Sequence, residues 1–348
     1  MIAQVHASAA KRVGTSIVAV HDSRKEKAVK FGNEHTCDVL DSVDLLLKRD
    51  DIEGVVIAVP NARHAELAIA ALKAGKHVLL EKPMAMSLQE CDAILHARDT
   101  SEKVLQMGFV CRYSPAALKA KEIIESGQIG DVLHVQATLL RQRGIPGIGG
   151  WFTTKAKSGG GCLIDIGVHL IDLAMHLTSN KNPTRVYGKC NQAFTIETYA
   201  YDEMWSTPVE DGTFDVEDRV RALLTDASGT TFQFDVAWAT HLPENTMKDG
   251  LMIEGSNGSL VVDLWGDELV CGFAEEGSPK TETILVELSD AWDDAFDGEH
   301  HAFAKAIAND HLDYGAGSGE DGRLVQQVVE AIYLSSNLQK EVVIRDTK

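Results

Sequence analysis

The chain has 348 residues, more than one hydrophobic core usually supports, so the sequence predicts two domains. A hydrophobic content of 44% and a charged content of 24% are typical of a soluble protein, and no apolar run approaches the roughly 18 residues of a membrane span. With 33 Lys and Arg against 52 Asp and Glu, the net charge of −19 repels nucleic-acid phosphates and anionic lipids, which argues against both as partners.

Residues 1–110 show short apolar runs separated by helical patterns, which is typical of β-α-β units. Residues 55–59 do not alternate between polar and apolar side chains, so we expect a parallel strand covered by helices on both faces. Residues 36–40 are expected to form an edge strand. The predicted fold class is α/β, with a doubly wound Rossmann-type parallel sheet in this N-terminal domain.

Three polar residues stand where helices of this domain are expected to begin. Asn61 precedes the helical pattern of residues 62–74, and Asp41 precedes that of residues 43–48. Ser87, with Glu90 three residues later, forms the pattern of a capping box.

Asp22 follows a predicted strand at residues 17–20. In dinucleotide-binding folds an acid at this position binds the ribose hydroxyls of the cofactor, about 20 residues after a glycine-rich turn. Counting back from Asp22 places Ala3 at the third position of such a turn, which accepts Gly or Ala. The alternative is that Asp22 only ends a strand. Arg24 and Lys25 would suit a 2′-phosphate, so NADP remains possible beside NAD.

Glu81, Lys82 and Pro83 follow a buried apolar strand. Open parallel sheets bind ligands at the carboxyl ends of their strands, so Lys82 is the first catalytic candidate. Pro83 restricts Lys82 to an extended backbone. A solvated strand end is the alternative for such a charged pair taken alone.

Asp165, His169, Asp172 and His176 are spaced as one face of a helix. Asp165 and His169 are expected to project into a cleft, where an imidazole can exchange a proton near neutral pH. Asp172 and His176 suit a polar surface stripe. Asp and His at this spacing can also bind zinc, although no third ligand is evident.

The second domain, residues 111–348, is predicted to be α+β with a mostly antiparallel sheet. Residues 226–229 and 256–258 have the composition of hairpin turns, and residues 321–339 form the last predicted helix. Residues 144–161 contain seven glycines and Trp151, which suits a lid or a substrate loop. The alternative is a flexible connection in which Trp151 is a packing residue.

Taken together, these motifs resemble the Gfo/Idh/MocA oxidoreductases, the group of glucose–fructose oxidoreductase and the inositol dehydrogenases. The segment Glu81-Lys82-Pro83 matches the family's EKP signature, and Asp165 and His169 match its catalytic helix motif. The likeness covers nearly the whole chain and includes further positions: Ala3, His6-Ala7, Asp22, Pro60-Asn61, His64, Gly108-Phe109, Arg112 to Pro115, Gly160-Gly161, Gly167 and Asp172.

The resemblance implies a NAD-dependent dehydrogenase that acts on a secondary alcohol of a sugar, inositol or related polyol. It implies that His169 is the general acid/base, that Lys82 hydrogen-bonds the reacting oxygen, and that Asp165 orients the substrate and Lys82 or His169. It also implies cofactor contacts, for which the candidates are Ala3, Asp22, Pro60, Asn61, His64, Glu81 and Lys82. Sugar rings favour aromatic and hydrogen-bonding walls, and the candidates for these are Arg112, Tyr113, Trp151 and His241.

Two other functions remain open. One is a non-catalytic sensor, because this fold also serves a transcriptional co-repressor that binds dinucleotide without turnover; the retained Lys82 and His169 argue against it. The other is a redox-neutral, glycosidase-like enzyme that oxidises and re-reduces the sugar in one cycle. We expect a cytoplasmic protein, because the six scattered cysteines include no C-x-x-C pair and indicate reduced thiols. We also expect a homo-oligomer, a dimer or tetramer.

The resemblance further implies that residues 1–13 are the first helix of the Rossmann domain, without the strand and the Gly-x-Gly turn that precede it. We expect that the start is assigned too far downstream, so that a Val/Ile-rich strand and a Gly-x-Gly turn are encoded upstream of Met1. The alternative is a real truncation, which should bind dinucleotide poorly.

Overall fold

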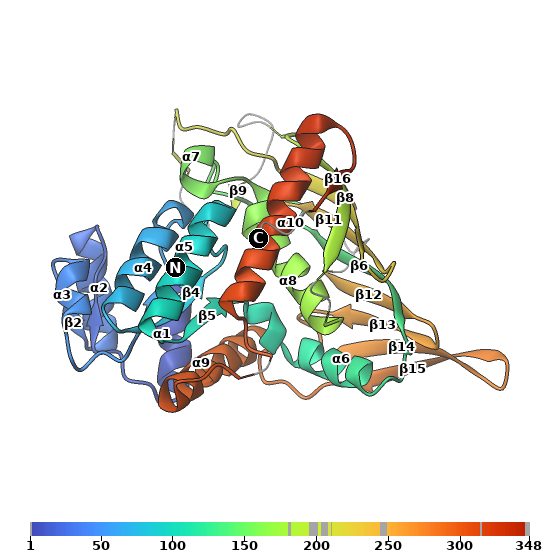
Figure 1. Ribbon diagram of the computed structural model, residues 1–348, viewed down its shortest axis with the longest axis horizontal. Helices are drawn as coiled ribbons and strands as arrows, with labels where there is room; N and C mark the ends of the chain where they lie inside the picture. The colour runs from blue at the N-terminus through green and yellow to red at the C-terminus, as the bar shows by residue number, and fades with distance from the viewer. Residues whose placement is uncertain are drawn as a thin grey trace.

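The computed structural model describes residues 2–179, 182–194, 201–202, 208–209, 211–243, 249–313 and 315–344. Helices alternate with short parallel strands in the N-terminal part, and one large sheet dominates the remainder (Figure 1). The prediction of an α/β fold with a mostly antiparallel C-terminal sheet is confirmed.

The N-terminal strands form two parallel sheets, β1-β2 and β3-β4-β5, within the part of the chain that the structure describes. The strands are β1 (Ala19–Val20), β2 (Asp38–Val39), β3 (Gly54–Ile57), β4 (His77–Glu81) and β5 (Leu105–Gly108). The helices are α1 (Ile2–Arg12), α2 (Lys25–His35), α3 (Val43–Leu47), η1 (Asn61–Arg63), α4 (His64–Lys73) and α5 (Leu88–Ser101).

Residues 55–57 lie in the parallel strand β3, as predicted, but the strand buried on both faces is β4, so the expectation that both faces of residues 55–59 are covered is wrong. All five residues of β4 are buried, whereas Val56 of β3 is 40% exposed. The reason is position in the sheet, because β4 lies between two partners and β3 has one. The strand that ends at Glu81 is thus the rigid centre of this domain.

Two of the predicted helix caps differ from expectation. Ser42 caps α3 in place of Asp41, because its side chain accepts from the Leu45 N–H. Asn61 caps nothing; its side chain donates to the Ser158 carbonyl at 2.8 Å. Ser87 caps α5 as predicted.

The C-terminal sheet has nine strands in the order β15-β14-β13-β12-β6-β11-β10-β8-β16, and only β6 and β11 pair in parallel. The two predicted hairpin turns join β10 to β11 and β12 to β13. The strands are β6 (Val132–Leu140), β8 (Pro183–Asn191), β10 (Arg219–Asp226), β11 (Thr231–Ala237), β12 (Gly250–Gly255), β13 (Gly258–Asp263), β14 (Glu268–Glu275), β15 (Ser278–Leu285) and β16 (Val342–Val343). Two further short strands, β7 (Ile145–Pro146) and β9 (Tyr201–Asp202), pair with each other.

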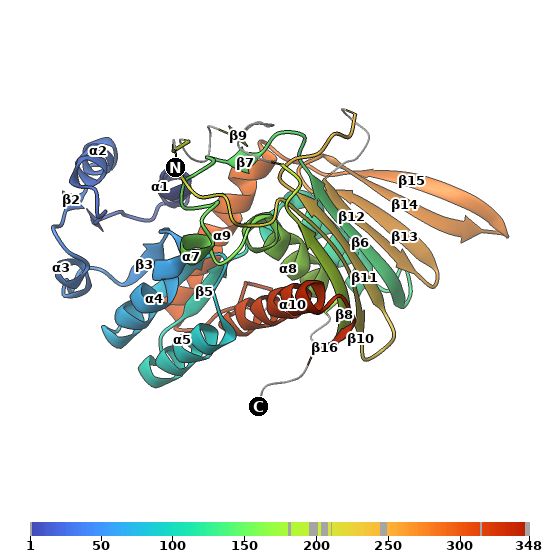
Figure 2. The ribbon, with the colours of Figure 1, turned by 90° about the horizontal axis from the view of Figure 1, so that it is seen from above.

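Helices cover one face of this sheet, as Figure 2 shows for α8 (Val168–Leu177) and α10 (Gly319–Leu338). Side chains that face these helices are apolar and buried, such as Val135, Phe232 and Ile253. Alternate residues project from the other face, where no described helix lies. A row of side chains in register on this open face is at least 40% exposed at four apolar positions: Tyr187, Leu223, Met252 and Val261.

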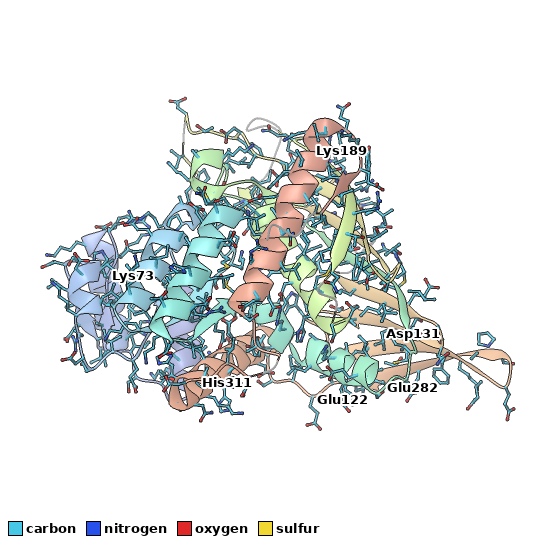
Figure 3. All side chains as sticks on the ribbon, viewed as in Figure 1. Lys73, Glu122, Asp131, Lys189, Glu282 and His311 are labelled. Atoms are coloured by element: carbon cyan, nitrogen blue, oxygen red, sulfur yellow. The ribbon has the colours of Figure 1, made fainter. Side chains whose placement is uncertain are left out.

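The chain returns to the N-terminal domain through α9 (Ala291–Asn309) and the start of α10. Arg12 of α1 donates to Asp297 of α9 at 2.7 Å, and the Met107 N–H of β5 donates to the Gly317 carbonyl at 2.8 Å. The remaining helices are η2 (Val110–Tyr113), α6 (Pro115–Glu125), α7 (Lys155–Ser158) and η3 (Leu163–Gly167). Figure 3 shows charged side chains over the periphery of both domains, for example Lys73 and Glu122.

The helical stretch Lys155–Leu177 is long and apolar enough to cross a membrane, but 83% of its most apolar window is buried inside the protein. That burial is typical of a core helix. All six cysteines are free thiols.

Candidate active site

Lys82 and Asp165 form an ion pair where the two domains meet. Lys82 extends from the carboxyl end of β4, and its Nζ donates to the Asp165 carbonyl at 2.7 Å and to Asp165 Oδ1 at 3.0 Å. Asp165 Oδ2 accepts from Trp238 Nε1 at 2.8 Å. Because both carboxylate oxygens are engaged, Asp165 holds Lys82 in one position. Lysine has three N–H donors, so one stays available to a ligand.

Asp165 lies in the π-helical turn η3, before the regular helix α8 begins. The single regular helix face predicted from the spacing is therefore interrupted at this residue. Gly160 and Gly161 make the turn possible, since a Cβ on Gly161 would lie 1.8 Å from the Glu217 carbonyl oxygen. Glu217 Oε1 in turn accepts from the N–H groups of Gly161 and Leu163.

His169 has no hydrogen-bond partner among the described residues, and its Nδ1 is a buried, unsatisfied atom. Burial and then the charge of Lys82 lower the pKa of His169 to about 3. The imidazole is consequently neutral at pH 7 and able to accept a proton from a bound molecule.

Glu81 is buried beneath the site. Burial alone would raise its pKa, but the hydrogen bond with His6 and the charges of His6 and Lys82 lower the pKa to about 2. His6 Nε2 lies 2.9 Å from Glu81 Oε1, and the other carboxylate oxygen accepts from the Lys82 N–H. This contact joins the first turns of α1 to the carboxyl end of β4.

Asp172 is buried, so its interpretation as part of a surface stripe is wrong. Its carboxylate makes a bidentate ion pair with Arg112, at 2.8 and 2.6 Å. Arg112 also pairs with Asp321 at 3.0 Å. The expectation that Arg112 contacts substrate is corrected by this geometry, because the guanidinium is committed to a buried structural pair. Tyr113 packs beside Gly298, and burial raises the pKa of its hydroxyl.

The remaining cofactor candidates lie at the ends of helices and strands of the N-terminal domain. Ala3 lies in the first turn of α1. Asp22 follows β1, and its Oδ1 accepts from the Arg24 N–H at 2.8 Å. His64 is directed inward, because its ring lies between the carbonyls of Pro83 and Val59. Burial lowers the pKa of His64, which fits a structural role. Pro60 is exposed at the turn before η1 and stays a candidate.

The glycine-rich segment is partly buried: residues 144–150 are all buried, whereas residues 155–157 are exposed. Gly149 adopts a φ of +81° and packs against Gly212, an approach that a Cβ on either residue would block. Trp151 stacks on Phe152 with ring centroids 3.7 Å apart. His241 is exposed, and its ring lies 5.2 Å from that of Phe194.

Sequence reasoning missed Trp238 and Arg141. Trp238 follows β11 and Arg141 follows β6, and the pairing of these strands brings both to the end of the sheet that faces Asp165. No local motif marks them, because a strand-end residue gains a role only through tertiary contacts.

As to the zinc alternative, the described part of the chain contains no cluster of three His, Cys, Asp or Glu side chains suited to a metal.

Two family models match the chain. One is described as an oxidoreductase family with a NAD-binding Rossmann fold and matches residues 1–109, and the other, the GFO/IDH/MocA C-terminal domain, matches residues 117–261. The chain belongs to the Gfo/Idh/MocA family. It is a NAD-dependent oxidoreductase, as the sequence predicts.

The chain is also similar in sequence and in structure to several sugar dehydrogenases. D-glucoside 3-dehydrogenase of Escherichia coli is 28% identical over 96% of this chain and 92% of its own length. Levoglucosan dehydrogenase of Pseudarthrobacter phenanthrenivorans is 31% identical over 72% of this chain, and the match spans 65% of that enzyme. A structure of levoglucosan dehydrogenase with NADH and levoglucosan superimposes with a TM-score of 0.88 at 25% identity, covering 99% and 97% of the two chains.

Proposed function

We propose that the protein oxidises a secondary ring hydroxyl of a sugar with NAD, and that Lys82, Asp165 and His169 carry the proton chemistry. The supporting observation is the Lys82–Asp165 ion pair beside a neutral imidazole with no protein partner. Two relatives with sugar-dehydrogenase names support the substrate class, and one of these names specifies carbon 3 of a glucoside.

In this proposal Lys82 donates its third N–H to the reacting oxygen and stabilises the negative charge that develops there. His169 takes the hydroxyl proton as general base. Asp165 positions Lys82 through its two acceptor contacts. Bound NAD supplies the acceptor for the hydride that leaves the carbon.

The residues present fit a dinucleotide. The first turn of α1 leaves backbone N–H groups without helical partners, and the contact of His6 with Glu81 places this helix against the end of β4. The Asp22 carboxylate has only its Oδ1 engaged by the Arg24 N–H, which leaves acceptor capacity for a ribose diol.

The test is a screen of glucosides, inositols and related polyols in which NADH formation is followed by absorbance, with NAD and NADP in parallel. Net NADH formation with a simple sugar supports the proposal. A sugar that is cleaved without net NADH would instead indicate the redox-neutral enzyme, and tight NADH binding without any turnover would indicate the sensor.

We expect a preference for NAD over NADP, because a carboxylate at position 22 repels a 2′-phosphate. Replacing Asp22 by Ser should raise kcat/KM for NADP and lower it for NAD, by about tenfold each, which corresponds to one charge-assisted hydrogen bond. The ratio of the two kcat/KM values measures the effect. An enzyme that prefers NADP before substitution contradicts the assignment of Asp22.

We also propose that the protein is a cytoplasmic homo-oligomer that pairs through the open sheet face. The exposed apolar row of Tyr187, Leu223, Met252 and Val261 supports this, since apolar patches of this kind are typical of interfaces. The six free thiols support the location. Light scattering should report an oligomer that Leu223→Glu dissociates and that Leu118→Glu, on α6, leaves intact. A monomer before substitution contradicts the proposal.

A further inference from the structure

Arg141 is a cation of the candidate site that the sequence motifs do not explain. Its N–H donates to the Ala237 carbonyl at 3.0 Å, immediately before Trp238, whose indole binds Asp165. Its half-buried side chain passes over Gly144, where an added Cβ would lie 2.5 Å from Arg141 Cδ. The glycine at position 144 therefore leaves the space that this arginine occupies.

The guanidinium of Arg141 has no hydrogen-bond or ion-pair partner within the described ranges. The nearby Asp249 uses its Oδ1 to accept from the Leu140 N–H at 3.1 Å. Burial and Lys82 dominate the pKa values of Asp165 and His169, and the charge of Arg141 also lowers both. Arg141 thus acts electrostatically on the residues of the site and on Asp249, but it has no hydrogen bond to a described carboxylate.

Arg141 is a charged group of the site that has no hydrogen-bonded counter-charge among the described residues. Lys82 pairs with Asp165, Glu81 contacts His6 and accepts from the Lys82 N–H, and His169 is neutral. Partial burial of a guanidinium is unfavourable unless an anion or an acceptor faces it. An anionic group of a ligand placed beside Arg141 would supply the hydrogen-bonding partner that the described residues do not provide.

We propose that Arg141 binds an anionic substituent of the substrate, so that the protein acts on a sugar carrying a carboxylate or a phosphate ester. The proposal rests on the proposed function, because it places the ring of this sugar beside Lys82 and His169. A guanidinium suits either anion, since its N–H groups form paired, charge-assisted hydrogen bonds with two oxygens. Arg141 is then a specificity residue and takes no part in proton transfer.

The experiment compares three sugars with one ring type: methyl glucoside, glucuronate and glucose 6-phosphate. Binding to the NADH-loaded protein is measured by calorimetry, and turnover is measured separately with NAD. We expect one of the charged sugars to bind at least about tenfold more tightly than methyl glucoside, as charge-assisted hydrogen bonds imply. Whichever of glucuronate and glucose 6-phosphate binds more tightly shows whether Arg141 prefers a carboxylate or a phosphate ester.

Arg141→Ala should abolish this preference and raise KM for the charged sugar with little change in kcat. Arg141→Lys should restore part of it. Arg143→Ala is the matched control, because it removes the same charge from an exposed position two residues away and should preserve the preference. Equal binding of charged and neutral sugars before substitution, or equal losses for both in Arg141→Ala, overturns the proposal. Absence of turnover alone contradicts the proposed dehydrogenase function and leaves the binding comparison to decide the role of Arg141.

Discussion

Replacing Lys82 by Ala is expected to lower kcat by at least about a hundredfold. The substitution removes the N–H that stabilises developing charge on the substrate oxygen, and loss of one such donor costs about 10² to 10³ in kcat. It also leaves the Asp165 carboxylate without its cation. Steady-state NADH formation at saturating substrate measures the effect, and added methylammonium should restore part of the activity by replacing the lost amine.

Lys76→Ala is the matched control for this prediction. Lys76 is also a lysine of the N-terminal domain whose Nζ donates to a backbone carbonyl, that of Arg49 at 2.6 Å, but it lies at the opposite end of β4 from Glu81. Its loss should reduce stability with little change in kcat. Near-normal turnover in Lys82→Ala, with the protein folded, would show that Lys82 does not contact the reacting oxygen.

The sequence predicts the part of the site that depends on strand order. The carboxyl ends of parallel strands converge at one edge of a sheet, so a charged Glu81-Lys82-Pro83 segment after a buried strand can be placed there without tertiary information. The same reasoning does not predict how far the side chains of a particular strand are exposed. Residues 55–59 and the β4 strand are both apolar in sequence. They differ in the number of neighbouring strands, which the sequence does not give.

The other incorrect predictions have one physical cause. In each of them the residue contacts a side chain or a strand that is distant in the sequence. Arg112 and Asp172 look like polar surface or pocket residues until the fold places them against each other. Trp238 and Arg141 gain their positions through the pairing of β6 with β11. The π-helical turn at Asp165 depends on the close approach of Glu217 to Gly161, and helical spacing alone cannot reveal it.

His169→Ala is expected to lower kcat by about a hundredfold or more, the usual scale for a positioned general base, while the affinity for NADH stays nearly unchanged. The control is His176→Ala on the same helix, which should change kcat by less than about threefold because His176 lies two turns from the site. Near-normal turnover in His169→Ala at saturating substrate would remove this histidine from the proton-transfer step.

The pH profile gives the sharper form of this prediction. Oxidation requires neutral His169, and the lowered pKa of about 3 keeps it neutral well below the ordinary histidine pKa of about 6.5. The kcat of the unaltered enzyme should therefore show no acid limb near pH 6.5 that belongs to His169. In Lys82→Ala the pKa of His169 should rise, because the ammonium charge that helps to lower it is gone, and residual activity should then fall at a higher pH than in the unaltered enzyme. An acid limb near pH 6.5 that disappears in His169→Ala would mean that water reaches the imidazole and that burial does not control its charge.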